Sequence, residues 1–134
     1  QDPYYRWLNN NFLLLQLPLA GLLFWIGTAT GAGGWALVLW GIPLRLVLVY
    51  HVTWLVNSAT HCWGTVAYDS GDASRNNKWV AALTFGEGWH NNHHAYPHSA
   101  RHGLQQGQID LTWEHIRLMR ALGLATKVRL PVAS

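Results

Sequence analysis

Charged side chains and cysteine are scarce in this sequence. Only 11% of its 134 residues are charged, whereas a soluble domain has about 25%. No charged residue lies between Arg6 and Arg45, and a single cysteine, Cys62, excludes an internal disulfide and a cysteine-based metal site. The net charge of +3 comes from scattered basic residues, so nucleic acid is not an expected partner.

Two long apolar segments occupy this poorly charged part of the chain. The first extends from Phe12 to about Thr28 and the second from Trp35 to about Val56. About 20 apolar residues cross the hydrocarbon layer of a membrane as a helix. We therefore expect residues 1–63 to form a transmembrane helical hairpin with its turn near residues 28–34. The alternative is a buried helical hairpin in a soluble protein.

The distribution of basic residues predicts an orientation for this hairpin. The turn lacks Lys and Arg, whereas the sequence after the second apolar segment contains many. The positive-inside rule then places residues 64–134 on the cytoplasmic side of an integral, multi-pass membrane protein in contact with lipid. In this part, Asp110 is expected to cap a C-terminal amphipathic helix, and Gly123 to end it. The expected fold class is thus an all-α membrane protein with a cytoplasmic, His-rich helical region.

Histidine is abundant, with eight residues, and three of them form a tight cluster. His90, His93 and His94 occupy positions i, i+3 and i+4 of HNNHH, which share one face of a helix. Asn57 and His61 in NSATH, at the end of the second apolar segment, are also one helical turn apart. Imidazole binds iron, zinc, copper and nickel, so these residues predict a metal site without identifying the metal.

Three ordered motifs carry a resemblance to a known family. They are NSATHCWG at 57–64, DSGDASRNN at 69–77 and GEGWHNNHHAYPHSARHG at 86–103. Together they resemble the membrane-bound Δ9 fatty-acyl desaturases, which include the stearoyl-CoA desaturases. The segments SARHG, QIDLTW and ALGLATKV favour the cyanobacterial, plant and bacterial branch. The resemblance covers essentially the whole chain, and it implies that residues 1–134 are the C-terminal part of a single desaturase domain.

The resemblance implies two iron ions held by nine histidines. These come from an HxxxxH box, a first HxxHH box, the histidine of NSAxH and a last HxxHH box. Carried over residue by residue, the histidines that match the last four ligands are His61, His90, His93 and His94. Asn57 matches an asparagine that contacts the centre through a water molecule.

The upstream histidine boxes of the family are not found in this sequence. Only His51 precedes His61, and Gln1 is not a start residue. We therefore expect the chain to be a fragment that begins within a longer protein. Such a fragment would be inactive by itself, because it has about half of the ligands.

The activity implied by the resemblance is oxygen-dependent insertion of a cis double bond, at Δ9, into a saturated fatty-acyl chain. The acyl group would be carried by coenzyme A or by a lipid. Saturated carbon has no proton that a protein base can remove, so the reaction needs O2 activated at a redox metal. The sequence has no flavin, haem or iron–sulfur motif. The family therefore implies an external electron donor such as ferredoxin or a b-type cytochrome.

Other polar residues near the predicted ligands are candidates for supporting roles. Residues that could hydrogen bond to the imidazoles are Glu87, Asn91 and Asp69. Residues beyond the box that could contact the substrate headgroup or the electron donor are His98, Arg101 and His102.

Three other interpretations stay open. The chain could belong to a hydroxylase or to a desaturase of another position within the same superfamily. It could be a non-catalytic membrane protein with a structural zinc site made by the four histidines. It could also bind haem through two histidines, although the HxxHH spacing disfavours axial ligands on opposite sides of one haem.

Overall fold

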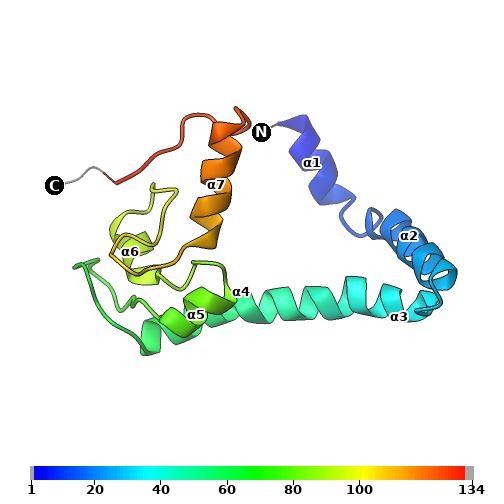
Figure 1. Ribbon diagram of the computed structural model, residues 1–134, viewed down its shortest axis with the longest axis horizontal. Coiled ribbons are helices and arrows are strands. Elements are labelled where there is room, and N and C mark those ends of the chain that lie inside the picture. The colour runs from blue at the N-terminus through cyan, green and yellow to red at the C-terminus, as the bar shows by residue number, and fades with distance from the viewer. Residues whose placement is uncertain (1, 132–134) are drawn as a thin grey trace. The chain divides into compact units, whose positions relative to one another are not determined.

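The computed structural model describes residues 2–131, which form helices and no strand. The helices in chain order are α1 (Pro3–Asn10), α2 (Gln16–Ala29), α3 (Gly34–Leu39), the π-helical segment η1 (Trp40–Leu44), α4 (Arg45–Cys62), α5 (Lys78–Leu83), α6 (His90–Ala95) and α7 (Leu111–Ala121) (Figure 1). The predicted all-helical class is confirmed. The chain divides into two compact units, the first ending at Tyr50 and the second beginning at His51.

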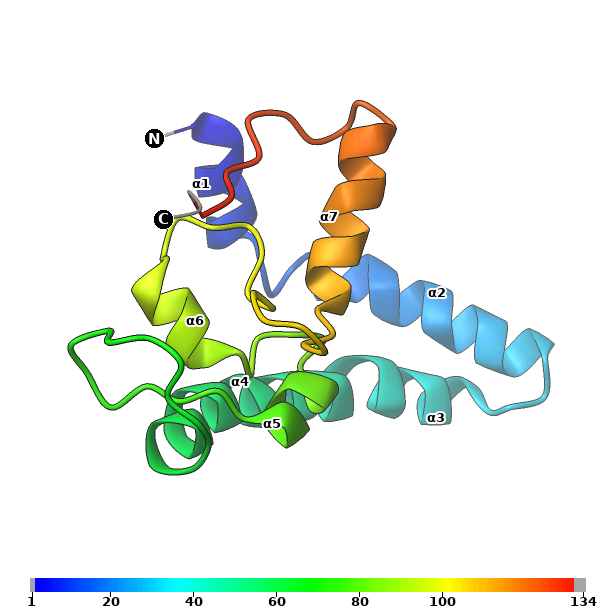
Figure 2. The same cartoon turned by 60° about the vertical axis from the view of Figure 1, so that its left-hand side comes forward.

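In the first unit, α2 packs against α3, its neighbour in sequence (Figure 2). The helices approach closely where Gly27 and Gly33 meet, because a Cβ atom on Gly27 would lie 2.6 Å from the Gly33 carbonyl oxygen. The rings of Phe24 and Trp35 form an edge-to-face pair with centroids 5.2 Å apart. The helical pair thus forms where the two apolar segments were expected to turn. Its insertion into a membrane stays a prediction.

The helix of the first apolar segment, α2, begins at Gln16, four residues after the segment itself begins at Phe12. Pro18 lacks an amide hydrogen and cannot donate the usual helical bond to Leu14. The Leu17 amide bonds to the Leu14 carbonyl instead, at 3.1 Å, which tightens the preceding turn. With 14 residues, α2 has a length of about 21 Å at about 1.5 Å per residue.

The second apolar segment forms the one described helix that is long and apolar enough to cross a membrane. It extends over 29 residues, Gly34–Cys62, and contains an apolar stretch with a mean hydropathy of 1.6. Pro43 lies in its π-helical segment, where the missing amide disturbs the regular pattern of backbone bonds. The Arg45 side chain folds back on the same helix and donates from Nε to the Gly41 carbonyl at 2.8 Å.

The second unit has a small core between the end of α4 and α5. Val56 and Ala59 of α4 pack with Val80 of α5, and all three are buried. The loop after α4 returns along the end of this helix, where the Arg75 amide bonds to the Thr60 carbonyl at 2.7 Å. This arrangement places the last turn of α4 beside the segment that leads into α6.

The start of α7 is attached to the rest of the second unit by Asp110. Its Oδ1 accepts the Trp113 amide at 2.8 Å, which caps the helix as predicted. Its Oδ2 accepts the His102 and Gly103 amides at 2.7 and 3.0 Å. Gly123 adopts a φ of 72° just after the helix, so the predicted end is also confirmed.

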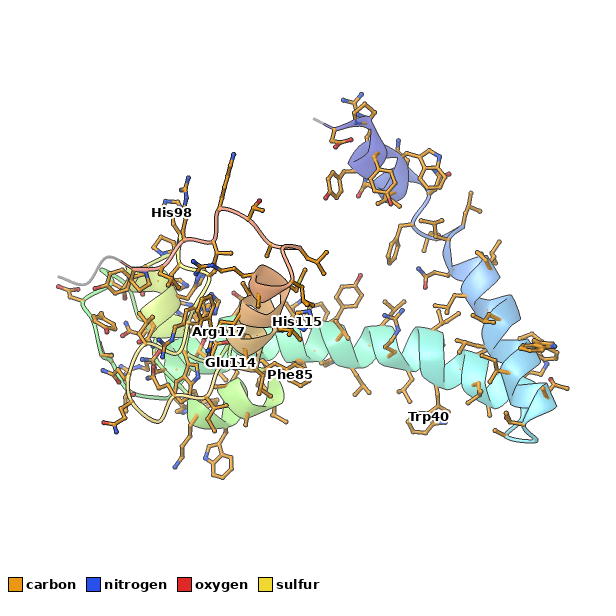
Figure 3. The ribbon with its side chains drawn as sticks, turned by 45° about the horizontal axis from the view of Figure 1, so that its top comes forward. Trp40, Phe85, His98, Glu114, His115 and Arg117 are labelled. Atoms are coloured by element: carbon orange, nitrogen blue, oxygen red, sulfur yellow. The ribbon has the colours of Figure 1, made fainter. Side chains whose placement is uncertain are left out.

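We expect Asp110→Ala to lower the free energy of unfolding by about 2 to 4 kcal/mol. The variant loses a helix cap and leaves buried backbone amides without an acceptor. Denaturant unfolding in detergent would measure this change. Glu114→Ala is the control, because Glu114 forms an exposed ion pair with Arg117 at 2.8 Å on the same helix (Figure 3). It should cost less than about 1 kcal/mol. Equal effects of the two variants would contradict the assigned role of Asp110.

Candidate metal centre

The C-terminal turn of α4 supplies the first of the predicted ligands. His61 lies one residue before the end of this helix and is half-buried. Asn57, one turn earlier, is exposed, and its Nδ2 donates to the Thr53 carbonyl at 3.1 Å. The sequence prediction that NSATH closes a helix is confirmed. The contact of Asn57 with a metal through water stays a prediction.

The HNNHH segment forms the short helix α6, whose buried side is held by asparagines. Asn76, in the loop before α5, accepts the Asn92 amide at 3.2 Å and donates from Nδ2 to Asn92 Oδ1 at 2.6 Å. Asn92 also donates to the His102 carbonyl at 2.7 Å and to Gln108 Oε1 at 2.7 Å. Asn92 is completely buried, so these bonds fix the orientation of α6 and therefore of its histidines.

Three predicted ligands from α4 and α6 converge. The candidate ligand atoms of His61, His90 and His94 all lie within 4.8 Å of one another. The Nε2 atoms of His61 and His90 are 3.2 Å apart. The ring centroids of His90 and His94 are separated by 4.3 Å, and those of His61 and His94 by 5.3 Å. Residues 29 positions apart in the chain thus form one cluster.

The spacing of these nitrogens fits a shared metal ion. Two nitrogens bound about 2.1 Å from one metal lie about 3.0 to 3.4 Å apart, for angles at the metal between about 90° and 109°. The 3.2 Å separation of the His61 and His90 Nε2 atoms falls within this interval. The donor set is all imidazole in this group, which suits iron, zinc, copper or nickel.

His93 lies beside this group of three but is not part of it. Its ring centroid is 5.7 Å from that of His94 and 6.0 Å from that of His90. On another side it lies against His102, with centroids 4.6 Å apart and the rings tilted by 44°. The Nδ1 atom of His93 is buried and has no hydrogen-bond partner. Buried polar atoms are normally paired. The Nδ1 atom of His93 is therefore available to bind a metal ion or to hydrogen bond to a group from the rest of the desaturase domain.

Burial and mutual repulsion favour neutral imidazoles in the cluster. Burial lowers the pKa of His90 to about 4, and the neighbouring His94, His61 and His93 add to this effect. Burial also lowers the pKa of His93, and the nearby His102 and His94 lower it further by smaller amounts. A metal needs the neutral ring as its ligand. At neutral pH, His90 is therefore ready to bind a metal without first losing a proton.

Asp72 is a functional candidate that the sequence interpretation missed. Its Oδ2 atom hydrogen bonds to Nδ1 of His94. Hydrogen bonds from the hydroxyl and amide of Ser74, and one from Ser70, hold the pKa of Asp72 well below its usual range. The available signal was its place in the DSGDASRNN motif, but the same motif contains Asp69, and residue type and spacing do not distinguish the two.

The other predicted supporting residues have varied positions. Glu87 Oε2 lies 3.6 Å from Nδ1 of His102, and the His102 ring in turn lies against His93. Asn91 is buried, and its carboxamide bonds to the loop of residues 67–74. Asp69 Oδ1 accepts the Gly71 amide at 3.1 Å within that loop. The supporting roles of these residues stay predictions.

The two remaining candidates follow α6. Arg101 donates from Nε to the Gly103 carbonyl at 2.6 Å, which forms a local turn. His98 is exposed just beyond the box (Figure 3). Neither residue belongs to the group of three histidines. Their predicted contacts with the substrate headgroup or the electron donor stay predictions.

Comparison with known proteins agrees with the family that the motifs resemble. The sequence model of the fatty acid desaturase family matches residues 2–121. The chain is 55% identical over 130 residues to an sn-1 stearoyl-lipid 9-desaturase of Synechocystis, covering 97% of this chain and 39% of the relative. It is 52% identical over 131 residues to a chloroplastic palmitoyl-monogalactosyldiacylglycerol delta-7 desaturase of Arabidopsis thaliana, covering 98% and 34%. An icosanoyl-CoA 5-desaturase of Limnanthes douglasii is 47% identical over 131 residues, with 98% and 35% covered.

This chain belongs to the fatty acid desaturase family. Within the family it is similar to cyanobacterial and plant acyl desaturases, including acyl-lipid 9-desaturases, as the motifs predicted. The chain spans 34% to 39% of the length of the three relatives described above.

Proposed function

We propose that this chain is the C-terminal part of an oxygen-dependent di-iron desaturase that acts on fatty-acyl chains. The main support is the convergence of His61 and His90, whose Nε2 atoms are 3.2 Å apart, in a member of the fatty acid desaturase family. Residues 1–63 would be the membrane part. Residues 64–134 would face the cytoplasm and carry the last histidine box. The rest of the desaturase domain would supply the remaining ligands.

We assign four imidazoles of this chain to the iron centre, and a water-mediated contact to Asn57. The four are His61, His90, His93 and His94. Bound iron would supply the oxygen-activating redox chemistry that removal of hydrogen from saturated carbon needs. The chain's own contribution is positional and electrostatic. Helices α4 and α6 would hold the rings of His61, His90 and His94 around one ion, with His93 beside them, and the low pKa of His90 keeps that ring neutral as a metal ligand.

For the substrate, we infer a saturated fatty-acyl chain carried by a lipid or by coenzyme A. The relatives are named for stearoyl-lipid, palmitoyl-monogalactosyldiacylglycerol and icosanoyl-CoA substrates and for positions 9, 7 and 5. Because the 9-desaturases include the match at 55% identity, we propose Δ9 insertion into an acyl-lipid first. An external donor such as ferredoxin or a b-type cytochrome would deliver the electrons. A hydroxylase or a desaturase of another position is the alternative within the family.

Metal content and product analysis of the intact polypeptide test this proposal. The polypeptide would be purified in detergent, its metals counted, and stearoyl-lipid supplied with O2, ferredoxin and a reductant. We expect two irons per polypeptide and a cis-9 product. One zinc per polypeptide without product would favour the structural zinc site instead. A hydroxylated product would identify the protein as a hydroxylase of the superfamily. A double bond at another position would identify it as a desaturase of that position.

A further inference from the structure

His94 is the one histidine of the group of three whose second ring nitrogen is bonded to a carboxylate. Nδ1 of His94 pairs with Asp72 Oδ2. A neutral imidazole carries one hydrogen, and a carboxylate accepts it. The hydrogen therefore resides on Nδ1, and Nε2 is left with a free lone pair. In His61 and His90, too, it is the Nε2 atoms that face each other.

The carboxylate of Asp72 is itself held in place. Its Oδ1 accepts the Ser70 hydroxyl at 2.9 Å and the Ser74 amide at 2.8 Å. The two serine hydroxyls are also 2.9 Å apart. With Oδ1 occupied in this way, Oδ2 remains for His94, so the orientation of the carboxylate is set before any metal binds.

The loop that carries Asp72 is anchored to the same helix as His94. Asn91 of α6 is completely buried. Its Oδ1 accepts the amides of Ala67 and Tyr68 at 2.8 and 2.9 Å, and its Nδ2 donates to the Tyr68 carbonyl at 2.9 Å and to Ser70 Oγ at 3.2 Å. Asn91 thus attaches the loop to α6, and the loop in turn supports His94 through Asp72.

Asp69 in the same loop has a different role. Its Oδ1 accepts the Gly71 amide at 3.1 Å, which closes a local turn. Asp69 and Asp72 are both exposed overall and carry the same charge. They differ in that Asp72 bonds to an imidazole of the cluster. Variants of Asp69 and Asp72 can therefore separate the effect of the hydrogen bond to His94 from the effect of a negative charge near the site.

We propose that Asp72 is a positioning residue that fixes His94 in the tautomer presenting Nε2 to the metal. The inference rests on the proposed function, because it assumes that His94 is a ligand. Carboxylates that bond to the outer nitrogen of a histidine ligand orient the ring and increase its basicity. Their loss typically costs about 10- to 100-fold in metal affinity. We expect this range for Asp72→Ala.

The experiment compares Asp72→Ala, Asp72→Asn and Asp69→Asn in the intact polypeptide. Iron affinity would be measured by competition with a chelator. The tautomer of His94 would be measured by nitrogen NMR of the metal-free, histidine-labelled protein. Asp72→Ala should bind iron about 10- to 100-fold more weakly and should lose the pure Nδ1–H tautomer. Asp72→Asn keeps a neutral acceptor and should lie between wild type and Asp72→Ala. Asp69→Asn should match wild type in both measurements.

Several results would overturn the positioning role of Asp72. One is unchanged iron affinity and tautomer in Asp72→Ala. Another is an equal loss of affinity in Asp69→Asn. A third is a loss of iron in Asp72→Ala that follows from unfolding of the metal-free protein. A His61→Ala variant separates this inference from the proposed function. If His61→Ala loses iron while Asp72→Ala does not, only the role of Asp72 fails. If wild type itself binds no iron, the proposed function fails.

Discussion

Replacing His90 with alanine is expected to remove iron from the intact polypeptide and to abolish desaturation. His90 is 6% exposed and central in the cluster, with Nε2 3.2 Å from His61 and its ring 4.3 Å from that of His94. Removing a ligand should cost more than the 10- to 100-fold typical of an outer contact, so we expect a loss of about 100-fold or more in iron affinity. Metal analysis after dialysis and product formation from stearoyl-lipid would measure it.

His115→Ala is the matched control for this prediction. His115 lies exposed on α7 and outside the group of three histidines (Figure 3), so its loss should leave iron content and product unchanged. A His90 variant also leaves a buried gap, which could lower stability by itself. His61→Ala answers this point, because His61 is only half-buried and should lose iron with less damage to packing. Wild-type iron content in both the His90 and the His61 variants would contradict the assigned centre.

Gly88→Ala is expected to prevent correct folding of the second unit. A Cβ atom on Gly88 would lie 2.0 Å from the Ala81 amide nitrogen and 2.6 Å from the Ala81 Cα atom. The obstacle is backbone, so α5 would have to move away from the segment that leads into α6. This would break the bond from the Asn77 amide to the Gly88 carbonyl at 2.8 Å and that from the Gly88 amide to Thr84 Oγ1 at 3.1 Å. We expect a loss of about 3 kcal/mol or more, at the upper end of overpacking effects.

Thermal unfolding and the yield of folded protein in detergent would measure the effect of Gly88→Ala. Gly21→Ala is the control, because a Cβ atom on Gly21 of α2 meets nothing within 4 Å. It should be neutral or slightly stabilising, since alanine favours a helix over glycine. We also expect Gly88→Ala to lose iron, because α6 follows Gly88 directly and carries three predicted ligands. Near wild-type stability of the Gly88 variant would show that α5 can shift at little cost.

Local sequence patterns predicted the helical parts of the second unit well. The spacing of HNNHH predicted one helical face, and His90–Ala95 is a helix. Asp110 and Gly123 predicted the ends of α7, where the cap and the positive φ are found. These features depend on residues one or two turns apart, so the sequence alone carries the information. The apolar segment from Phe12 to about Thr28 did not by itself locate the start of α2 at Gln16, because apolar residues occur both in the helix and in the turn before it.

Contacts between segments far apart in the chain were harder to predict from the sequence. The choice between Asp69 and Asp72 depends on the path of a polar loop, and this path is set by Asn91, about 20 residues further along the chain. The roles of Asn92 and Gln108 were also missed. Nothing in the sequence indicates that a buried asparagine of α6 bonds to a glutamine 16 residues later.

The sequence by itself determined the helical class, the family motifs and the histidines available as ligands. These follow from residue types and short spacings, which physical chemistry interprets locally. Only the tertiary structure decided which ligands converge, with His61, His90 and His94 grouped and His93 turned toward His102. It also selected Asp72 as the partner of His94. The reason is that ring orientation depends on how α4, α6 and the intervening loop pack, and this packing arises from many contacts between residues far apart in the chain.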